Sequence, residues 1–228
     1  MRAVTKGVLV AVVFVNVALI LAGLLLAPAT LGSLAGVGIV VADIGLQGTL
    51  LAVGLTGPVS LDRLGDAAGY CLAAAVAFAL AYDALLLLDL AGRPVQLSPY
   101  VPFVIAAVVA SCVAGYRTRR LLQGLLAAVW SLVLGTALWS TGFMTRTYVL
   151  WGTRREYLFW LRDGAVAEFH HGGGRDLSVF LLKDIQGALF FHPFLSLGLG
   201  LLLGAAGAGA GLVAATLVGA RDRSVVAD

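Results

Sequence analysis

The stretch GVLVAVVFVNVALILAGLLLA, from Gly7 to Ala27, decides the fold of this chain. It is continuously apolar except for the amide side chain of Asn16. About 20 apolar residues in a helix cross the roughly 30 Å hydrocarbon core of a bilayer. Because the run does not alternate between polar and apolar residues, it indicates a transmembrane helix and not a membrane strand. It is also longer than the roughly 7–15-residue core of a secretory signal peptide, so we expect it to be retained.

Five more runs of this kind follow, separated by polar joints, in a chain that is 61% hydrophobic and 12% charged. A soluble fold cannot bury so much apolar surface. The composition therefore predicts an all-α polytopic membrane protein of the kind found in prokaryotes, built as a six-helix transmembrane bundle. The predicted spans are Gly7–Ala27, Leu34–Leu55, Ala67–Leu88, Tyr100–Tyr116, Leu121–Phe143 and Pro193–Gly219.

Basic residues predict the orientation, because the cytoplasmic loops of membrane proteins collect Lys and Arg. If the N-terminus is inside, the short outer joints hold Arg93 alone, whereas the long segment before the last span holds six basic residues and reduces the bias. We expect a cell-membrane protein with both termini in the cytoplasm. The basic residues on the inner side are then Arg2, Lys6, Arg63, Arg117, Arg119, Arg120, Arg221 and Arg223.

Polar side chains inside the predicted spans are the strongest candidates for a functional site. Asp43 lies near the membrane midplane, where a carboxylate costs on the order of 2.5–3.5 kcal/mol. Gln47 follows one helical turn later on the same face. Counted from the tight turn between the first two spans, Asn16 has the depth of Asp43 to within about 3 Å, and Asp83 lies roughly 6 Å nearer the outer surface. The sequence thus predicts an intramembrane polar cluster of Asn16, Asp43, Gln47 and Asp83.

Three interpretations of this cluster remain open. It could bind an ion, a proton or a polar substrate, as intramembrane carboxylates often do. It could instead fix helix packing through interhelical hydrogen bonds, each contributing about 0.6 kcal/mol. Finally, an aspartate could form a salt bridge with an arginine of a partner subunit.

The segment after the fifth span is predicted to contain β-structure outside the cytoplasm. Asp163-Gly164 is a preferred two-residue hairpin turn, because both positions need a positive φ. Tyr157–Arg162 and Ala165–His171 are therefore predicted to pair as a β-hairpin, and Thr147–Trp151 could add a third strand of a small meander.

The chain accordingly divides into three parts: residues 1–143 with five spans, an extracytoplasmic segment at 144–192, and residues 193–228 with the last span and a short cytoplasmic tail. The final stretch of the middle part, Asp176–His192, starts with a capping residue and carries Leu and Ile at helical spacing. It is predicted to be an interfacial amphipathic helix, or else an extension of the last span.

Two weaker patterns concern metal binding and helix packing. Adjacent residues on a strand point to opposite faces, so His170 and His171 cannot share an ion, and His192 is distant along the chain; they are weak metal candidates and no metal is expected. Small residues spaced by four allow helices to approach closely in lipid. The last span has this pattern at Gly200, Gly204, Gly207 and Gly211. Our first interpretation is that these glycines pack against other helices of the same chain, and our second is that they form a contact face for a partner or a second copy.

No motif in the chain points to a reaction. The sequence contains no P-loop, HExxH or Gly-x-Ser-x-Gly motif, no span carries a lysine for a retinal Schiff base, and no cofactor is expected. The leading prediction is an accessory or assembly subunit of a larger membrane complex, and the alternative is a small transporter or substrate-binding membrane subunit using the polar cluster. A membrane enzyme is third. The expected partners are the lipid bilayer and other membrane subunits or further copies of the chain, and not nucleic acid.

Overall fold

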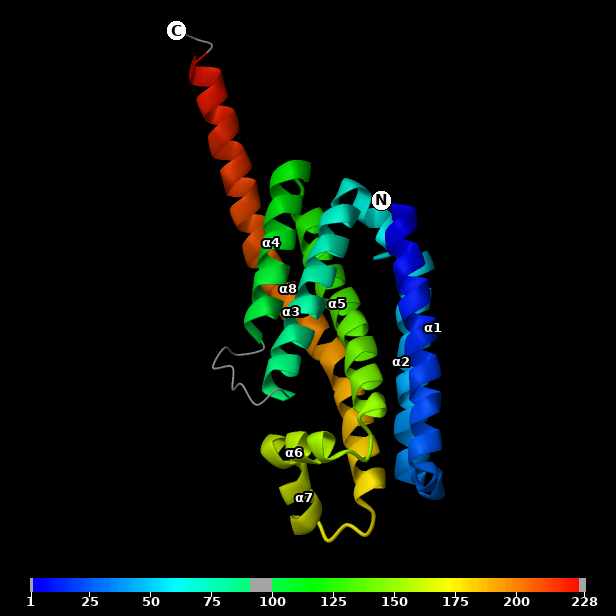
Figure 1. Cartoon of the computed structure of the whole chain (residues 1–228). Coiled ribbons are helices and arrows are strands. Elements are labelled where there is room, and N and C mark those ends of the chain that lie inside the picture. The colour runs from blue at the N-terminus through cyan, green and yellow to red at the C-terminus, as the bar shows by residue number, and fades with distance from the viewer. Residues whose placement is uncertain (1, 91–99, 226–228) are drawn as a thin grey trace.

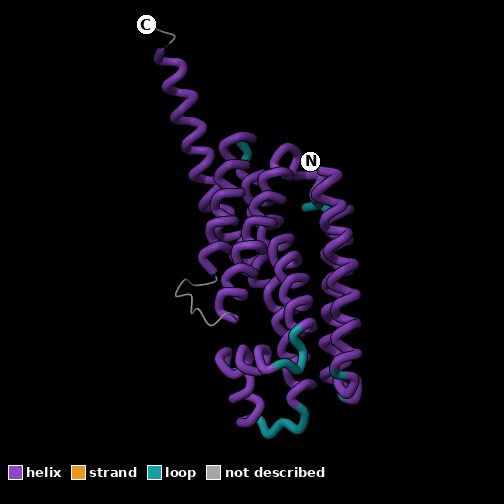
Figure 2. Tube along the Cα trace, in the orientation of Figure 1, coloured by secondary structure: helices purple, strands orange, loops and turns teal. Residues whose placement is uncertain are grey.

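The computed structural model describes residues 2–90 and 100–225, and in these ranges it contains helices and loops but no strand (Figure 2). Arg93, from the predicted outer joint, lies outside the described residues. In the described part of the chain the elements are α1 (Arg2–Leu26), η1 (Pro28–Gly32), α2 (Leu34–Thr56), η2 (Leu61–Ala67), α3 (Ala68–Leu90), α4 (Tyr100–Thr118), α5 (Leu121–Val149), α6 (Arg154–Asp163), α7 (Ala165–His171) and α8 (Leu177–Val225).

Six helical segments among the described residues are long and apolar enough to cross a membrane. They correspond to the six predicted spans, and this part of the fold prediction is confirmed. The chain therefore has the architecture of a multi-pass membrane protein. The six segments are Arg2–Leu26, Leu34–Thr56, Leu61–Leu85, Val101–Thr118, Leu121–Val149 and Leu177–Val218.

The helices run between two ends of an elongated bundle (Figure 1). The start of α1, η2, the joint between α4 and α5, and the end of α8 lie at one end, which we call the N-terminal end. The turn between α1 and α2, with α6 and α7, lies at the opposite end. All eight basic residues predicted to be cytoplasmic belong to segments at the N-terminal end. Which side of the membrane this end faces stays a prediction.

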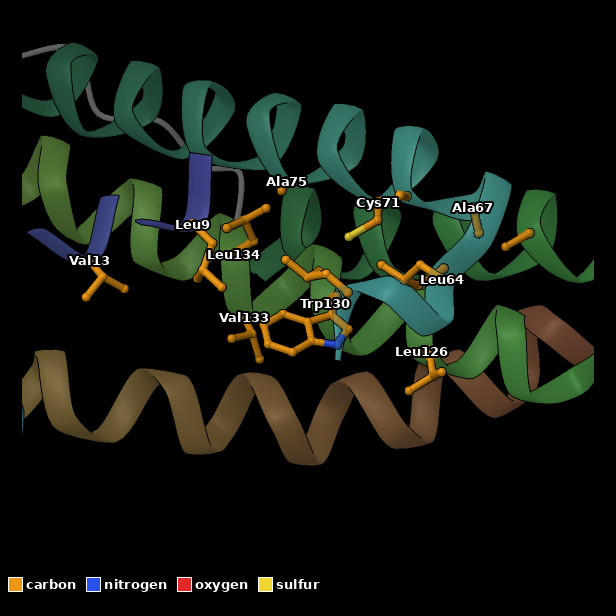
Figure 3. Packing of buried hydrophobic residues seen from close by; sticks show 14 residues of the cluster. Leu9, Val13, Leu64, Ala67, Cys71, Ala75, Leu126, Trp130, Val133 and Leu134 are labelled. Atoms are coloured by element: carbon orange, nitrogen blue, oxygen red, sulfur yellow. The ribbon is translucent and has the colours of Figure 1, made fainter. Parts of the chain in front are cut away.

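Helix α5 is the central helix of the bundle. In its most apolar stretch 67% of the residues are buried, and it packs against α1, α3, α4 and α8. Figure 3 shows side chains of α1, η2, α3 and α5 meeting around Trp130. The indole Nε1 of Trp130 donates a hydrogen bond to the carbonyl oxygen of Val59 at 2.7 Å, which ties the loop after α2 to the core.

The predicted β-hairpin is wrong, because both of its strands are helical. Thr153 caps α6 by accepting a hydrogen bond from the backbone N–H of Glu156 at 3.3 Å. Gly164 then adopts a left-handed conformation, with φ 97°, between α6 and α7. Asp163-Gly164 thus terminates one helix and starts the next, a role in which glycine is as favourable as in a hairpin turn. The predicted third strand, Thr147–Trp151, is the end of α5 followed by a turn.

The last span does not begin at Pro193. Helix α8 starts at Leu177 and continues without interruption through Pro193, so the predicted amphipathic stretch is an extension of the span. The capping prediction holds, since Asp176 Oδ1 accepts a hydrogen bond from the backbone N–H of Val179 at 3.1 Å. With 49 residues, α8 is about 70 Å long. That length exceeds the bilayer core, and its last part extends beyond the neighbouring helices (Figure 1).

Candidate functional site

Asp43 and Gln47 are buried on one face of α2, one helical turn apart. Their side chains are 1% and 4% exposed. Among residues 2–90 and 100–225, neither carboxylate oxygen of Asp43 has a hydrogen-bond partner, and the same holds for Oε1 of Gln47. A buried polar group without a partner carries the full cost of its lost hydration. These two side chains therefore lower the stability of the fold relative to apolar side chains of similar size.

Two residues that the sequence did not single out lead away from Asp43: Tyr148 lies near Asp43, and Gln186 lies beside Tyr148. The hydroxyl of Tyr148, near the end of α5, faces the side chain of Gln186 on α8 and is within electrostatic reach of Asp43. Gln186 is fully buried, and neither atom of its amide is hydrogen-bonded within the part of the chain that the structure describes. We call Asp43, Gln47, Tyr148 and Gln186 the Asp43 cluster.

Packing between α2 and α8 brings this cluster together. The side chain of Ile39, one turn before Asp43, lies over Gly187, the residue after Gln186. The Tyr148 hydroxyl lies against Gly23 of α1, where any larger residue would displace it. Helices α1, α2, α5 and α8 thus all contribute to the surroundings of the Asp43 carboxylate.

Asn16 has a different environment from Asp43, although it is equally buried. Its amide Nδ2 donates a hydrogen bond to the carbonyl oxygen of Ala137 at 3.0 Å, and its Oδ1 accepts one from the Thr141 hydroxyl at 2.6 Å. Both partners belong to α5. Asn16 therefore joins α1 to the central helix, and both ends of its amide are hydrogen-bonded there.

Asp83 is separated from α2 by its position in the bundle. Its helix, α3, packs against α4 and α5, whereas α2 packs against α1 and α8. The Asp83 carboxylate lies against Gly142, and the positive charge of Arg146, one turn further along α5, acts on it. Of the four predicted residues, the structure thus places Asp43 and Gln47 side by side, Asn16 in hydrogen bonds to α5, and Asp83 beside a different part of α5.

The sequence did contain a signal for Gln186. Leu182, Ile185 and Leu189 are buried on α8, and Gln186 lies among them at helical spacing. A glutamine within an apolar helical stripe is as unusual as an aspartate within a span. Tyr148 carries no such signal, because a tyrosine near the end of a span fits the aromatic belt equally well.

The histidines are dispersed along α7 and α8. His170 and His171 are exposed on α7, and the Nδ1 atoms of His171 and His192 lie 2.7 Å from the carbonyl oxygens of Ala167 and Ala188, four residues earlier in each case. Among the described residues, no group of three His, Cys, Asp or Glu side chains could hold a metal ion. The three histidines therefore form no common site.

The glycine face of α8 packs within the chain. A Cβ atom added at Gly200, Gly204, Gly207 or Gly211 would lie 3.0 Å or less from an atom of α4 or α5. The glycines therefore allow α8 to lie directly against its two neighbours. Gly200 faces Val129, Gly204 faces Ala128, Gly207 faces Ser111, and Gly211 faces Cys112 and Tyr116.

Outside the spans, Glu156 on α6 is a buried carboxylate with partners. Burial raises its pKa above the ordinary value of 4.5, while hydrogen bonds from the Gly152 backbone N–H and the Trp160 indole act in the opposite direction. The Gly152 bond is 2.5 Å long and the Trp160 bond 3.3 Å. Glu156 therefore holds the start of α6, in contrast to Asp43.

Comparison of the chain with known protein families, with curated proteins and with solved structures finds no match. The chemistry available at the Asp43 cluster follows from its four side chains. A carboxylate, two amides and a phenol enclosed between helices can exchange a proton or offer oxygen ligands to a cation. They include no nucleophile paired with a base, as covalent catalysis would require.

Proposed function

We propose that this chain is a small membrane transporter, or the substrate-binding membrane subunit of one, in which Asp43 binds a proton or a small cation. One observation carries the proposal: the Asp43 carboxylate is 1% exposed and has no hydrogen-bond partner in residues 2–90 and 100–225. Carboxylates inside membrane spans are costly and are associated with ion and proton pathways. Leucine would fit on α2 without that cost, so an occupant that needs the carboxylate is the best explanation for it.

The neighbours of Asp43 favour a proton or a cation that prefers oxygen ligands. Gln47, Gln186 and Tyr148 carry amide and hydroxyl oxygens, which act as hydrogen-bond acceptors and cation ligands. In the described residues no Lys, Arg or His forms an ion pair with Asp43. A bound proton or cation would supply the neutralising charge that the described residues do not.

The burial of Asp43 also argues against a salt bridge to a partner subunit. A side chain that is 1% exposed offers a partner's arginine no direct contact while the helices keep this arrangement. An assembly subunit would carry its recognition groups on an accessible surface. Asp43 is therefore better suited to a ligand small enough to enter the bundle.

An accessory or assembly subunit is the second candidate, and α6 and α7 favour it. These two short helices lie beyond the spans at the opposite end of the bundle (Figure 1). They carry exposed charged side chains of both signs, including Arg154, Arg155, Arg162 and Glu168. Such a surface could contact a partner outside the membrane.

The direct test measures charge movement in proteoliposomes adsorbed on a solid-supported membrane. Jumps in pH, Na⁺, K⁺ or ammonium concentration should produce a transient current with the wild-type protein. The current should vanish in Asp43→Asn, which keeps the size of the side chain but removes its charge. Asp176→Asn is the matched control, because asparagine caps a helix as well as aspartate does. No current above that of empty liposomes, or an unchanged current in Asp43→Asn, would contradict the proposal.

A stability measurement separates a binding site from a packing role. Asp43→Leu removes a buried group without partners, and we expect it to raise the free energy of unfolding by about 1–3 kcal/mol. Residues kept for function often show this trade-off between stability and activity. If Asp43 instead fixed helix packing, its removal would be destabilising.

Native mass spectrometry of gently extracted protein tests the second candidate, the accessory or assembly subunit, which requires partner chains in fixed ratio.

A further inference from the structure

A hollow of about 500 Å³ opens at the N-terminal end of the bundle. Four separate parts of the chain enclose it: the start of α1, η2 with the beginning of α3, the end of α4, and the first turn of α5. Polar and charged side chains form most of its wall. The lining residues are Arg2, Leu64, Gly65, Asp66, Ala67, Tyr70, Arg117, Thr118, Arg120 and Gln123.

The charge of this hollow is strongly positive. Arg2, Arg117 and Arg120 come from three different segments and face the same space, together with the one carboxylate of Asp66. Nearby, Asp62 is paired with Lys6 through a 2.6 Å salt bridge. Asp62 is therefore already paired, and the three guanidinium groups outnumber the one carboxylate of Asp66, so the hollow keeps a net positive charge that favours an anion.

The backbone around the hollow is shaped to bring these arginines together. Arg119, between Arg117 and Arg120, has φ 53°, a conformation that residues other than glycine seldom adopt. Gly65 in η2 has φ 56°, and Arg2 Nη2 lies 3.5 Å from where a Cβ of Gly65 would be. The two unusual conformations thus lie in separate parts of the wall, each beside an arginine of the hollow.

A hydrogen bond holds two of the walls in place. The amide Nε2 of Gln123, on the first turn of α5, donates to the carbonyl oxygen of Arg63 in η2 at 2.5 Å. The Thr118 hydroxyl donates a hydrogen bond to the carbonyl oxygen of Ala114 at 2.7 Å, and both residues belong to α4. The Gln123 bond fixes the η2 wall of the hollow against the α5 wall.

We infer that this hollow binds a phosphate group, and that an anionic phospholipid headgroup is its main source. Arginine presents a planar fork of donors that matches phosphate oxygens. The hollow lies where the transmembrane helices end, which is the depth of lipid headgroups, and basic pockets between such helix ends are known to hold anionic headgroups. A soluble phosphate compound has the same recognition chemistry. This inference does not depend on the proposed transport function.

The test is native mass spectrometry of the full-length protein in detergent, titrated with phosphatidylglycerol or with phosphatidylcholine of identical acyl chains. Wild type should bind phosphatidylglycerol more tightly. Arg117→Gln/Arg120→Gln should weaken that binding about tenfold or more, because hydrogen bonds between charged groups are strong. Arg154→Gln/Arg155→Gln, which removes two exposed arginines of α6 at the other end of the bundle, is the matched control and should bind as wild type does.

Two further measurements identify the source of the phosphate and guard against misfolding. Inorganic phosphate at millimolar concentration should not displace phosphatidylglycerol; if it does so completely, soluble phosphate is the ligand and the headgroup assignment is overturned. Arg117→Lys keeps the charge but loses the fork, so it should fold as wild type and bind with intermediate strength. Equal loss in both double variants, or equal binding of the two lipids, would show general attraction to charge and overturn the site.

Discussion

Replacing Gly211 by alanine tests how tightly α8 is packed against α4. A Cβ atom at this position would lie 2.8 Å from the backbone nitrogen of Tyr116, 3.1 Å from the carbonyl carbon of Cys112, and closer still to the Cys112 oxygen. These are backbone atoms, which cannot rotate away as a flexible side chain would. The two helices must therefore move apart before alanine can be accommodated.

The size of the effect follows from that displacement. Non-bonded heavy atoms prefer separations of about 3.5 Å or more, so the contact with the Tyr116 nitrogen alone requires α8 to move by about 0.7 Å. A gap of this size loses a quarter to a half of each dispersion contact nearby. Overpacking a close interface typically costs about 1–3 kcal/mol. Alanine also favours helix over glycine by about 1 kcal/mol, which partly offsets the loss.

Gly209 provides the control in the same helix, because a Cβ there meets nothing within 4 Å. Gly209→Ala has the same propensity gain without the clash, so the difference between the two variants isolates the packing. By thermal unfolding in detergent, followed by tryptophan fluorescence, Gly211→Ala should melt lower than Gly209→Ala by about 2–10 °C. Equal melting temperatures would refute the close packing of α8 on α4.

Three further predictions concern substitutions of single residues. Burial raises the pKa of Glu156 above 4.5, so at pH values between the two pKa values the native state keeps a proton that the unfolded chain has lost. The free energy of unfolding should therefore fall as the pH rises from 4.5 through the native pKa. Melting curves taken across this pH range should show the decrease in wild type and a flatter dependence in Glu156→Gln. Asn16→Leu removes two hydrogen bonds to α5 and should lower the free energy of unfolding by about 1 kcal/mol, measured by the same thermal assay; an unchanged value would contradict the bonds. Gly164→Ala forces alanine to φ 97° and should cost about 1–2 kcal/mol, whereas Gly172→Ala, at φ −75°, should cost less in parallel melts.

The six spans were predictable because the bilayer imposes one length on every helix that crosses it. A run such as Gly7–Ala27 has no other stable state in lipid, whatever its neighbours are. The ends of the helices were less predictable. Pro193 was expected to begin the last span, yet α8 continues through it. Proline is tolerated inside transmembrane helices where surrounding groups compensate for the lost hydrogen bond.

The β-hairpin prediction failed because a two-residue signal was weighed above a longer one. Asp163-Gly164 fits both a hairpin turn and the end of a helix, since glycine tolerates a positive φ in either. Thr153 and Glu156 have the Thr-x-x-Glu spacing typical of a helix start, and the structure shows Thr153 capping α6. With a start signal eleven residues before the glycine, the helix was the better prediction.

The candidate site shows what depth counting along the spans can and cannot provide. Residue spacing gives the height of Asn16, Asp43 and Asp83 in the bilayer, but it does not give the neighbour that each side chain faces. That neighbour depends on the rotation of each helix about its axis, which the whole set of packing contacts determines. Asn16 faces hydrogen-bonding groups of α5, Asp83 lies near the charge of Arg146, and Asp43 faces Gln47 and the groups from α5 and α8.

The environments of Asn16 and Asp43 predict opposite responses when the polar group is removed. Removing the polar group of Asn16 breaks hydrogen bonds and costs stability, whereas removing that of Asp43 breaks none within the described residues and relieves a desolvation cost. A fold selected for stability alone would keep the first and replace the second. The presence of Asp43 near Tyr148 therefore supports our proposal of a bound ligand over a role in packing alone.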